Sequence, residues 1–185
     1  MRRAASFGHI GFMQRLLSNV HFKTFGVAAA AAANGHLDCL KYAHENGFPW
    51  NEATCSAAVE AGHLECLQYA LEHACPYHSC IMDIAASNGH LACLVYLHQR
   101  GIHPWDACTC AEAATGGHLQ CLKYLHRQGC AWDVNTVEHA AMKGHWDCVR
   151  YAQQHNCPCN GMMLMMCALY CLDGLFGLVG AKATL

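Results

Sequence analysis

The stretch GHLECLQYA, residues 62–70, decides the fold because it returns in near-identical form along the chain. The other copies are GHLDCLKYA (35–43), GHLACLVYL (89–97), GHLQCLKYL (117–125) and GHWDCVRYA (144–152). The Gly-His pair alone starts at residues 8, 35, 62, 89, 117 and 144, at intervals of 27, 27, 27, 28 and 27. A fixed period of this length indicates a protein built from stacked structural repeats.

Other residue types keep the same period, and we call the residues that share one position in successive repeats a column. Tyr follows the Gly of the pair by seven residues in five repeats, and Ala precedes that Gly by four. All four prolines share one column, and the next column holds three of the four tryptophans and, once, Tyr77. An insertion at His103 explains the single longer interval. The repeats therefore cover most of the chain, from about Ala4 to Gly161.

Each repeat reads as two short helices. Asn51 is a typical N-cap residue, and the small residues 52–61 that follow it predict a first helix, which Gly62 ends. Residues 64–74 predict a second helix with apolar side chains on more than one face, and Pro76 then breaks the chain direction. Alternating β-branched residues are missing from the sequence, so we expect an all-α protein without a sheet.

Composition excludes several classes of protein. Of the 185 residues, 54% are hydrophobic and 13% are charged, which is too apolar for a disordered chain. The formal net charge of −2 gives no electrostatic case for binding nucleic acid or an anionic membrane. The 15 cysteines come without a secretory signal. Residues 1–26 are basic and free of acids, which resembles a mitochondrial transit segment, but the repeat register already covers the chain from Gly8 onward. We therefore expect a reducing, intracellular compartment.

The core A-A-x-x-G-H-L-x-C-L-x-Y resembles that of the ankyrin repeat family. The repeat here is shorter than the family's usual unit of about 33 residues, and a short G-x-P-W-[DN] turn stands where the family has a β-hairpin finger. This short Cys- and Trp-rich variety is similar to repeats of large DNA viruses of protists, of oomycetes and of brown algae. The resemblance implies an ankyrin-like helix-turn-helix solenoid of about six repeats that serves as a non-catalytic protein-binding scaffold.

The repeated cysteines could hold a metal or form part of the core; they are Cys39, Cys66, Cys93, Cys121 and Cys148. Packed helices lie about 8–10 Å apart, whereas a disulfide needs Cα atoms within about 4.4–6.8 Å. A shared zinc ion needs sulfurs about 2.3 Å away. We therefore expect these thiols to be small buried hydrophobic side chains. The remaining cysteines lack zinc-finger spacing, and a metal-binding protein is the lesser alternative.

The histidine that follows Gly in every repeat could be one of a row of bases or could bond the backbone of the tight turn. A residue present in every repeat serves the repeat, whereas a catalytic residue usually occurs once, so we expect the turn role. A second column, His44, His98 and His126, is expected near the end of the second helix, where a cation meets the helix dipole favourably. The sequence contains no known catalytic or phosphate-binding motif, and we expect neither an enzyme nor a cofactor or metal.

Positions that change between repeats are the candidates for binding a partner, because a stacked array places them on one continuous face. The tryptophan column is either an aromatic binding stripe or a packed cover of the turn. The resulting partner-binding candidates are Trp50, Glu52, Tyr77, Asp83, Trp105, Glu112, Trp132, Glu138 and His139.

The C-terminal stretch leaves the repeat register. Residues 162–180 are almost wholly apolar, with Asp173 as their one charged residue and with glycines that weaken a helix. We therefore divide the chain into an ankyrin-like repeat domain, 1–161, and a hydrophobic segment, 162–185, that caps the stack or forms a degenerate repeat. The alternative is a membrane-tethered scaffold through residues 162–180. We expect a monomer that binds a protein and not nucleic acid, in the cytoplasm or elsewhere in the cell, or in the host cytoplasm if the protein is viral.

Overall fold

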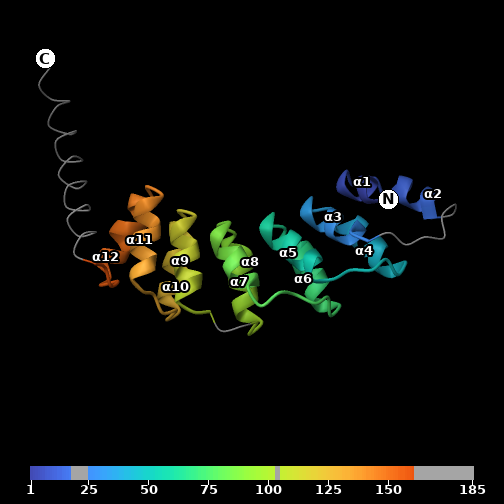
Figure 1. Cartoon of the computed structure of the whole chain (residues 1–185). Helices are drawn as coiled ribbons and strands as arrows, with labels where there is room; N and C mark the ends of the chain where they lie inside the picture. The colour runs from blue at the N-terminus through green and yellow to red at the C-terminus, as the bar shows by residue number, and fades with distance from the viewer. Residues whose placement is uncertain (18–24, 103–104, 161–185) are drawn as a thin grey trace, which may run out of the picture. The chain divides into compact units, whose positions relative to one another are not determined.

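The computed structural model describes residues 1–17, 25–102 and 105–160. Within these ranges the regular structure consists of twelve helices and no strand. The helices are α1 Arg2–Ser6, α2 Ile10–Leu17, α3 Val27–Ala33, α4 Leu37–Glu45, α5 Glu52–Glu60, α6 Leu64–Glu72, α7 Ile81–Ser87, α8 Leu91–Gln99, α9 Ala107–Thr115, α10 Leu119–Arg127, α11 Val134–Met142 and α12 Trp146–Gln154. They form two compact parts, the first with α1–α8 (Met1–Trp105) and the second, from Asp106, with α9–α12 (Figure 1).

The helices come in pairs joined by the Gly-His turn, so odd-numbered helices are the first and even-numbered helices the second of each repeat. In the first part, α3 packs between α1 and α5, and α5 also contacts α7. The second helices stack in the same order, with α4 between α2 and α6 and α6 against α8. In the second part, α9 packs against α11 and α10 against α12. The prediction of about six helix-turn-helix repeats without hairpin fingers is confirmed for the described residues.

Three first helices begin at a capping side chain. The side-chain oxygens of Asn51, Asp106 and Asp133 each accept a hydrogen bond from the backbone N–H two residues later. His78 occupies the same column before α7, and that helix starts only at Ile81 without a side-chain cap. As a result α7 has seven residues where α5, α9 and α11 have nine. The sequence prediction of Asn51 as an N-cap is confirmed.

The Gly-His turn follows from the backbone conformation at its glycine. Gly62 has a φ of +73°, in the left-handed region that glycine enters without steric cost. The N–H of His63 then reaches the carbonyl of Ala58 at 2.8 Å, and the N–H of Gly62 reaches that of Val59 at 3.1 Å. These bonds satisfy carbonyls that the helix end leaves free.

Both helices of the repeat are slightly shorter than the sequence predicts. The first ends at Glu60 rather than residue 61, and the second ends at Glu72 rather than residue 74. The second helix stops because Ala74 has a φ of +56°. It occupies the left-handed position that glycine fills in three other repeats, namely Gly47, Gly101 and Gly129.

The core of each part is made of small and branched apolar side chains between the helix layers. All five cysteines of the repeated column are at most 1% exposed. The leucine that follows each of the first four, Leu40, Leu67, Leu94 and Leu122, is fully buried. Burial raises the pKa of Cys66 to about 11, as it does for its equivalents Cys93, Cys121 and Cys148. The prediction that this column belongs to the core is confirmed.

Candidate interaction surface

The histidines of the Gly-His turns link successive repeats. Nε2 of His90 donates a hydrogen bond to the carbonyl oxygen of Glu60 at 2.9 Å, and Nε2 of His36 donates to that of Ser6 at 3.2 Å. Both carbonyls end the first helix of the preceding repeat, where backbone acceptors lack helical partners. His36 and His90 thus bond backbone groups, as predicted, but the bonded carbonyl belongs to the preceding repeat.

The same imidazole rings cover the glycines of the preceding turns. A Cβ added to Gly8 would stand 2.9 Å from Nδ1 of His36, and His145 covers Gly117 in the same way. Real Cβ atoms essentially never approach other atoms so closely. Gly8, Gly35, Gly62 and Gly117 thus each leave room for the histidine of the next repeat, which explains why Gly and His recur together.

A cluster of rings, which we call the aromatic seam, lies at the ends of the second helices that are farther from the Gly-His turns. Trp50 stacks on His44, with ring centroids 4.0 Å apart and planes 14° from parallel. The hydroxyl of Tyr69 shares a hydrogen bond of 2.9 Å with Nδ1 of His44. The ring of His73 lies 4.2 Å from that of Tyr69, and the ammonium of Lys41 lies 5.8 Å from the same ring. The seam joins residues of two successive repeats.

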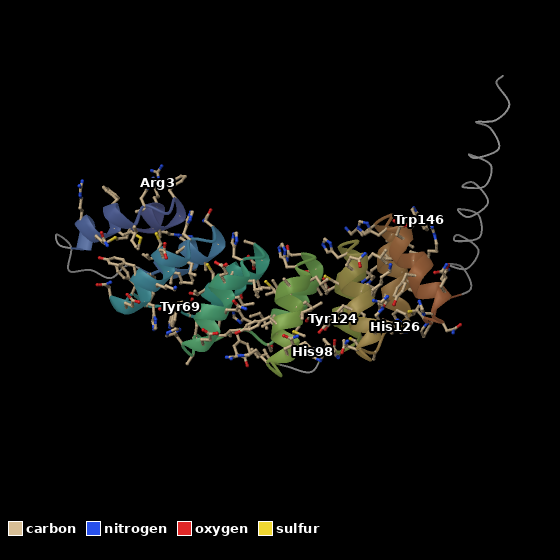
Figure 2. All side chains as sticks on the ribbon, turned by 180° about the vertical axis from the view of Figure 1, so that it is seen from behind. Arg3, Tyr69, His98, Tyr124, His126 and Trp146 are labelled. Atoms are coloured by element: carbon tan, nitrogen blue, oxygen red, sulfur yellow. The ribbon has the colours of Figure 1, made fainter. Side chains whose placement is uncertain are left out.

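The second part contains a copy of this seam. Trp132 stacks on His126 at 4.0 Å, and the Tyr151 hydroxyl shares a 2.8 Å hydrogen bond with Nδ1 of His126. The ring of His155 lies 4.5 Å from that of Tyr151. Figure 2 shows His126 at one edge of this part and Trp146, beside the Gly-His turn, at the opposite edge. The seam is therefore a repeated element of the frame.

The seam disfavours a positive charge on its second-helix histidines. Burial lowers the pKa of His44, and the neighbouring His73 lowers it further, while Glu45 opposes the change. The pKa of His126 is lowered by burial and then by His155 and Arg127. His44 and His126 lie in the last turn of their helices as predicted, but the lowered pKa of each disfavours the cation that was expected to meet the helix dipole there.

One seam of the first part is incomplete. Leu71 occupies the column of His44 and His126, and Tyr77 occupies the column of the tryptophans. The tyrosine of the next repeat, Tyr96, therefore meets no histidine. Its hydroxyl is shielded from solvent and has no hydrogen-bond partner among the described residues.

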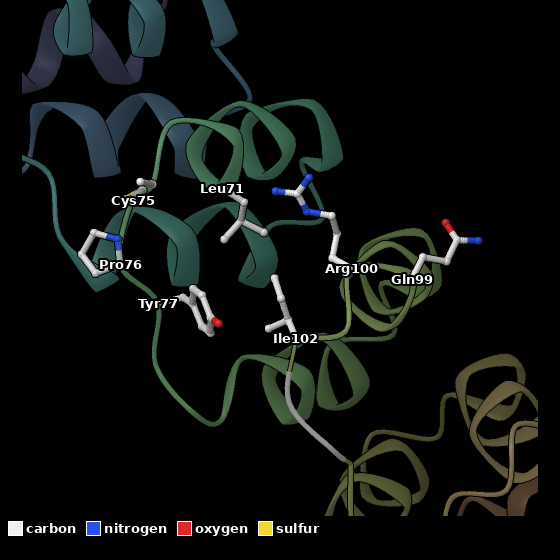
Figure 3. A pocket seen from close by; sticks show the side chains of 8 residues that line it. Leu71, Cys75, Pro76, Tyr77, Gln99, Arg100 and Ile102 are labelled. Atoms are coloured by element: carbon white, nitrogen blue, oxygen red, sulfur yellow. The ribbon is translucent and has the colours of Figure 1, made fainter.

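A groove of about 660 Å³ opens beside the incomplete seam. Its lining residues come from the ends of α6 and α8 and from the turns that follow them; they are Leu71, Ala74, Cys75, Pro76, Tyr77, Gln99, Arg100 and Ile102. In Figure 3 the side chains of Leu71, Tyr77 and Ile102 project toward the same space. Sequence reasoning missed this groove, although the simultaneous loss of His and Trp at Leu71 and Tyr77 was a visible signal.

The structure places the predicted partner-binding residues in separate groups. The three tryptophans are half-buried, two in the complete seams and Trp105 with its ring 3.9 Å from His98. This packing favours the interpretation of the tryptophan column as a cover of the turn. Tyr77 is 37% exposed and lines the groove.

The other predicted residues lie half-exposed on the first helices. Glu52 and Asp83 belong to the neighbouring helices α5 and α7 of the first part. Glu112, Glu138 and His139 belong to the neighbouring helices α9 and α11 of the second. Within each part these side chains therefore lie on adjacent helices.

Cysteines outside the repeated column donate hydrogen bonds to backbone carbonyls. Sγ of Cys130 donates to the carbonyl of Asp106 at 3.2 Å, and Sγ of Cys157 donates to that of Asp133 at 3.3 Å. Across the described ranges no three His, Cys, Asp or Glu side chains are grouped so as to hold a metal ion. Over the same ranges no helix is long and apolar enough to cross a membrane. The predicted hydrophobic segment, 162–185, lies outside the described residues.

Comparison with known proteins places this geometry among ankyrin repeats. Residues 27–107 match the family model described as ankyrin repeats in three copies. The chain is similar to the crystal structure of the human ASB11 ankyrin repeat domain, with a TM-score of 0.70 and 19% sequence identity over 85% of this chain and 83% of that one. Searching curated protein sequences gave no match. The fold is thus that of an ankyrin-repeat domain, and the viral Cys- and Trp-rich variety stays a prediction.

Proposed function

We propose that this chain, which has an ankyrin-repeat fold, is a non-catalytic scaffold that binds a protein partner through the half-exposed side chains of its first helices. The observation that carries the proposal is that repeated and changing columns have different roles. The repeated Gly, His, Cys and Tyr residues pack and hydrogen-bond within the fold, whereas Asp83 and Glu138 differ from their equivalents Ser56 and Ala111.

Charge on the first helices indicates the chemistry of the partner. The helices α5, α7, α9 and α11 contain Glu or Asp but neither Lys nor Arg, whereas α3 is uncharged and α1 contains two arginines. Glu52 and Asp83 make the neighbouring helices α5 and α7 acidic, and Glu112 and Glu138 do so for α9 and α11. A complementary partner presents basic side chains, which speeds association and makes binding weaker at high salt.

The thiols support an intracellular compartment. None of the thirteen described cysteines is in a disulfide, and most are buried. A reducing intracellular environment keeps such thiols reduced. The proposed scaffold therefore acts inside a cell, and proximity labelling in the native cell is the way to capture its partner.

The direct test uses variants of the acidic face. Replacing Glu52 and Asp83 by Gln and Asn should weaken binding of the captured partner by about tenfold, which corresponds to a combined loss of about 1.4 kcal/mol. A matched control replaces Glu65 and Glu72, exposed on the second helix α6, by Gln. Equal loss of binding in the control, or no loss in the test variant, would refute the proposed face.

A further inference from the structure

We propose that the groove between α6 and α8 is a second binding site, and that it takes an extended segment of a partner protein in which an acidic residue adjoins an apolar one. The proposal rests on the scaffold function above, but it concerns a different surface and the opposite charge. Its basis is the interruption of the aromatic seam at Leu71 and Tyr77.

The interruption removes the side chains that fill this position elsewhere. In the complete seams an imidazole and an indole stack at 4.0 Å and occupy the end of the second helix. Leu71 and Tyr77 cannot reproduce that stack together with the hydrogen bond to the next tyrosine. The lining is mixed, and its apolar part, formed by Leu71, Pro76 and Ile102, is available to a hydrophobic side chain.

The interruption also changes the contacts of the next tyrosine. The hydroxyl of Tyr96 has no partner in the described residues, whereas the equivalent hydroxyls of Tyr69 and Tyr151 bond an imidazole. The hydrogen-bond donor that the groove offers beside this ring is the guanidinium of Arg100, whose Cζ lies 5.8 Å from the centroid of the Tyr96 ring.

Arg100 also gives the site its charge. It is the one charged residue among the eight that line the groove. It stands in the column of His73 and His155, whose rings lie against the equivalent tyrosines in the complete seams. A carboxylate accepts hydrogen bonds from a guanidinium, and charge-assisted bonds of this kind are the stronger class. An acidic side chain is therefore the group that Arg100 fits.

The probe is a pair of acetylated, amidated hexapeptide libraries applied to the immobilised full chain. One library has Asp or Glu followed by Leu, Ile, Met or Phe at its centre, and the other has Asn or Gln in place of the acid. We expect the acidic library to be retained and its amide counterpart to be lost. Equal retention of the two libraries, or retention of neither, would overturn the proposal.

Two variants then test the site with the best retained peptide. Arg100→Gln removes the charge on an exposed side chain, and Leu71→His restores the residue that completes the other seams. Each should weaken peptide binding by about tenfold. Arg100→Gln removes a charge-assisted contact, and Leu71→His fills the space in the groove that the peptide would occupy. Lys41→Gln is the matched control, because Lys41 lies 5.8 Å from the ring of Tyr69 in a complete seam. It should leave peptide binding unchanged.

The outcomes of the two proposals are separable. Thermal unfolding of each variant shows whether it is folded, and if Leu71→His is not, Arg100→Gln alone decides. Peptide binding that survives Arg100→Gln contradicts the groove site while leaving the acidic face of the first helices untouched. Loss of partner binding from the Glu52 and Asp83 variant, with peptide binding retained, identifies two independent surfaces.

Discussion

The imidazole of His63 lies against Gly35 of the preceding repeat, so that a Cβ added to Gly35 would stand 2.7 Å from Nδ1 of His63. Gly35 also has a φ of +70°. We predict that Gly35→Ala lowers the free energy of unfolding by about 1–2 kcal/mol for the left-handed backbone and by about 1–3 kcal/mol more for overpacking. Urea unfolding at neutral pH measures the loss.

Gly101 provides the control for this prediction. Its φ is +67°, but an added Cβ would find nothing within 4 Å. Gly101→Ala should therefore show only the backbone loss. In a His63→Ala background the loss from Gly35→Ala should fall to that of Gly101→Ala, and a loss that stays as large would contradict the contact.

Capping of α7 offers a gain in stability. His78 stands where Asn51, Asp106 and Asp133 cap their helices, and α7 has no side-chain cap. We predict that His78→Asp raises the free energy of unfolding by about 1 kcal/mol, because the carboxylate accepts from free N–H groups of the first turn. The converse change, Asp106→Ala, should lower it by a similar amount, and a gain absent from His78→Asp would mean that the turn geometry forbids the cap.

Much of this frame could be predicted from sequence, because each repeat satisfies the same local demands. Helix pairs, turn glycines, the Asn51 cap and the buried cysteines follow from period, residue size and backbone preference. The aromatic seam could not be predicted by considering one repeat, since His44 meets Tyr69 of the next. The groove was missed for the same reason: residues of two successive repeats line it, such as Leu71, Tyr77 and Ile102.

The aromatic seam makes stability depend on pH. The pKa of His44 is lowered in the folded protein, by burial first and then by His73, whereas an unfolded histidine titrates near about 6.5. The unfolded chain therefore binds more protons as pH falls below about 6.5, and folding loses stability there. We predict a larger loss between pH 7.5 and pH 5 for the natural chain than for His44→Gln in urea unfolding. Equal losses would show that His44 is not held neutral.

Thiol reactivity should follow burial. Cys80 and Cys108 are exposed, whereas the repeated column is buried and Cys66 has a pKa of about 11. Only a thiolate reacts readily, so we predict that iodoacetamide modifies Cys80 and Cys108 at neutral pH while Cys66 and Cys93 stay protected until urea unfolds the chain. Peptide mapping by mass spectrometry assigns each site. Early modification of Cys66 would contradict its place in the core.

The central claim is that repeated residues hold the frame and changed residues bind the partner, and one paired measurement tests it. The dissociation constant for the captured partner and the urea midpoint are measured for His63→Ala and for the Glu52→Gln, Asp83→Asn variant. The account predicts a lower midpoint with unchanged affinity for His63→Ala, and about tenfold weaker binding with an unchanged midpoint for the acidic-face variant. The account would be contradicted if His63→Ala, measured where that variant is fully folded, weakened binding while the acidic-face variant did not.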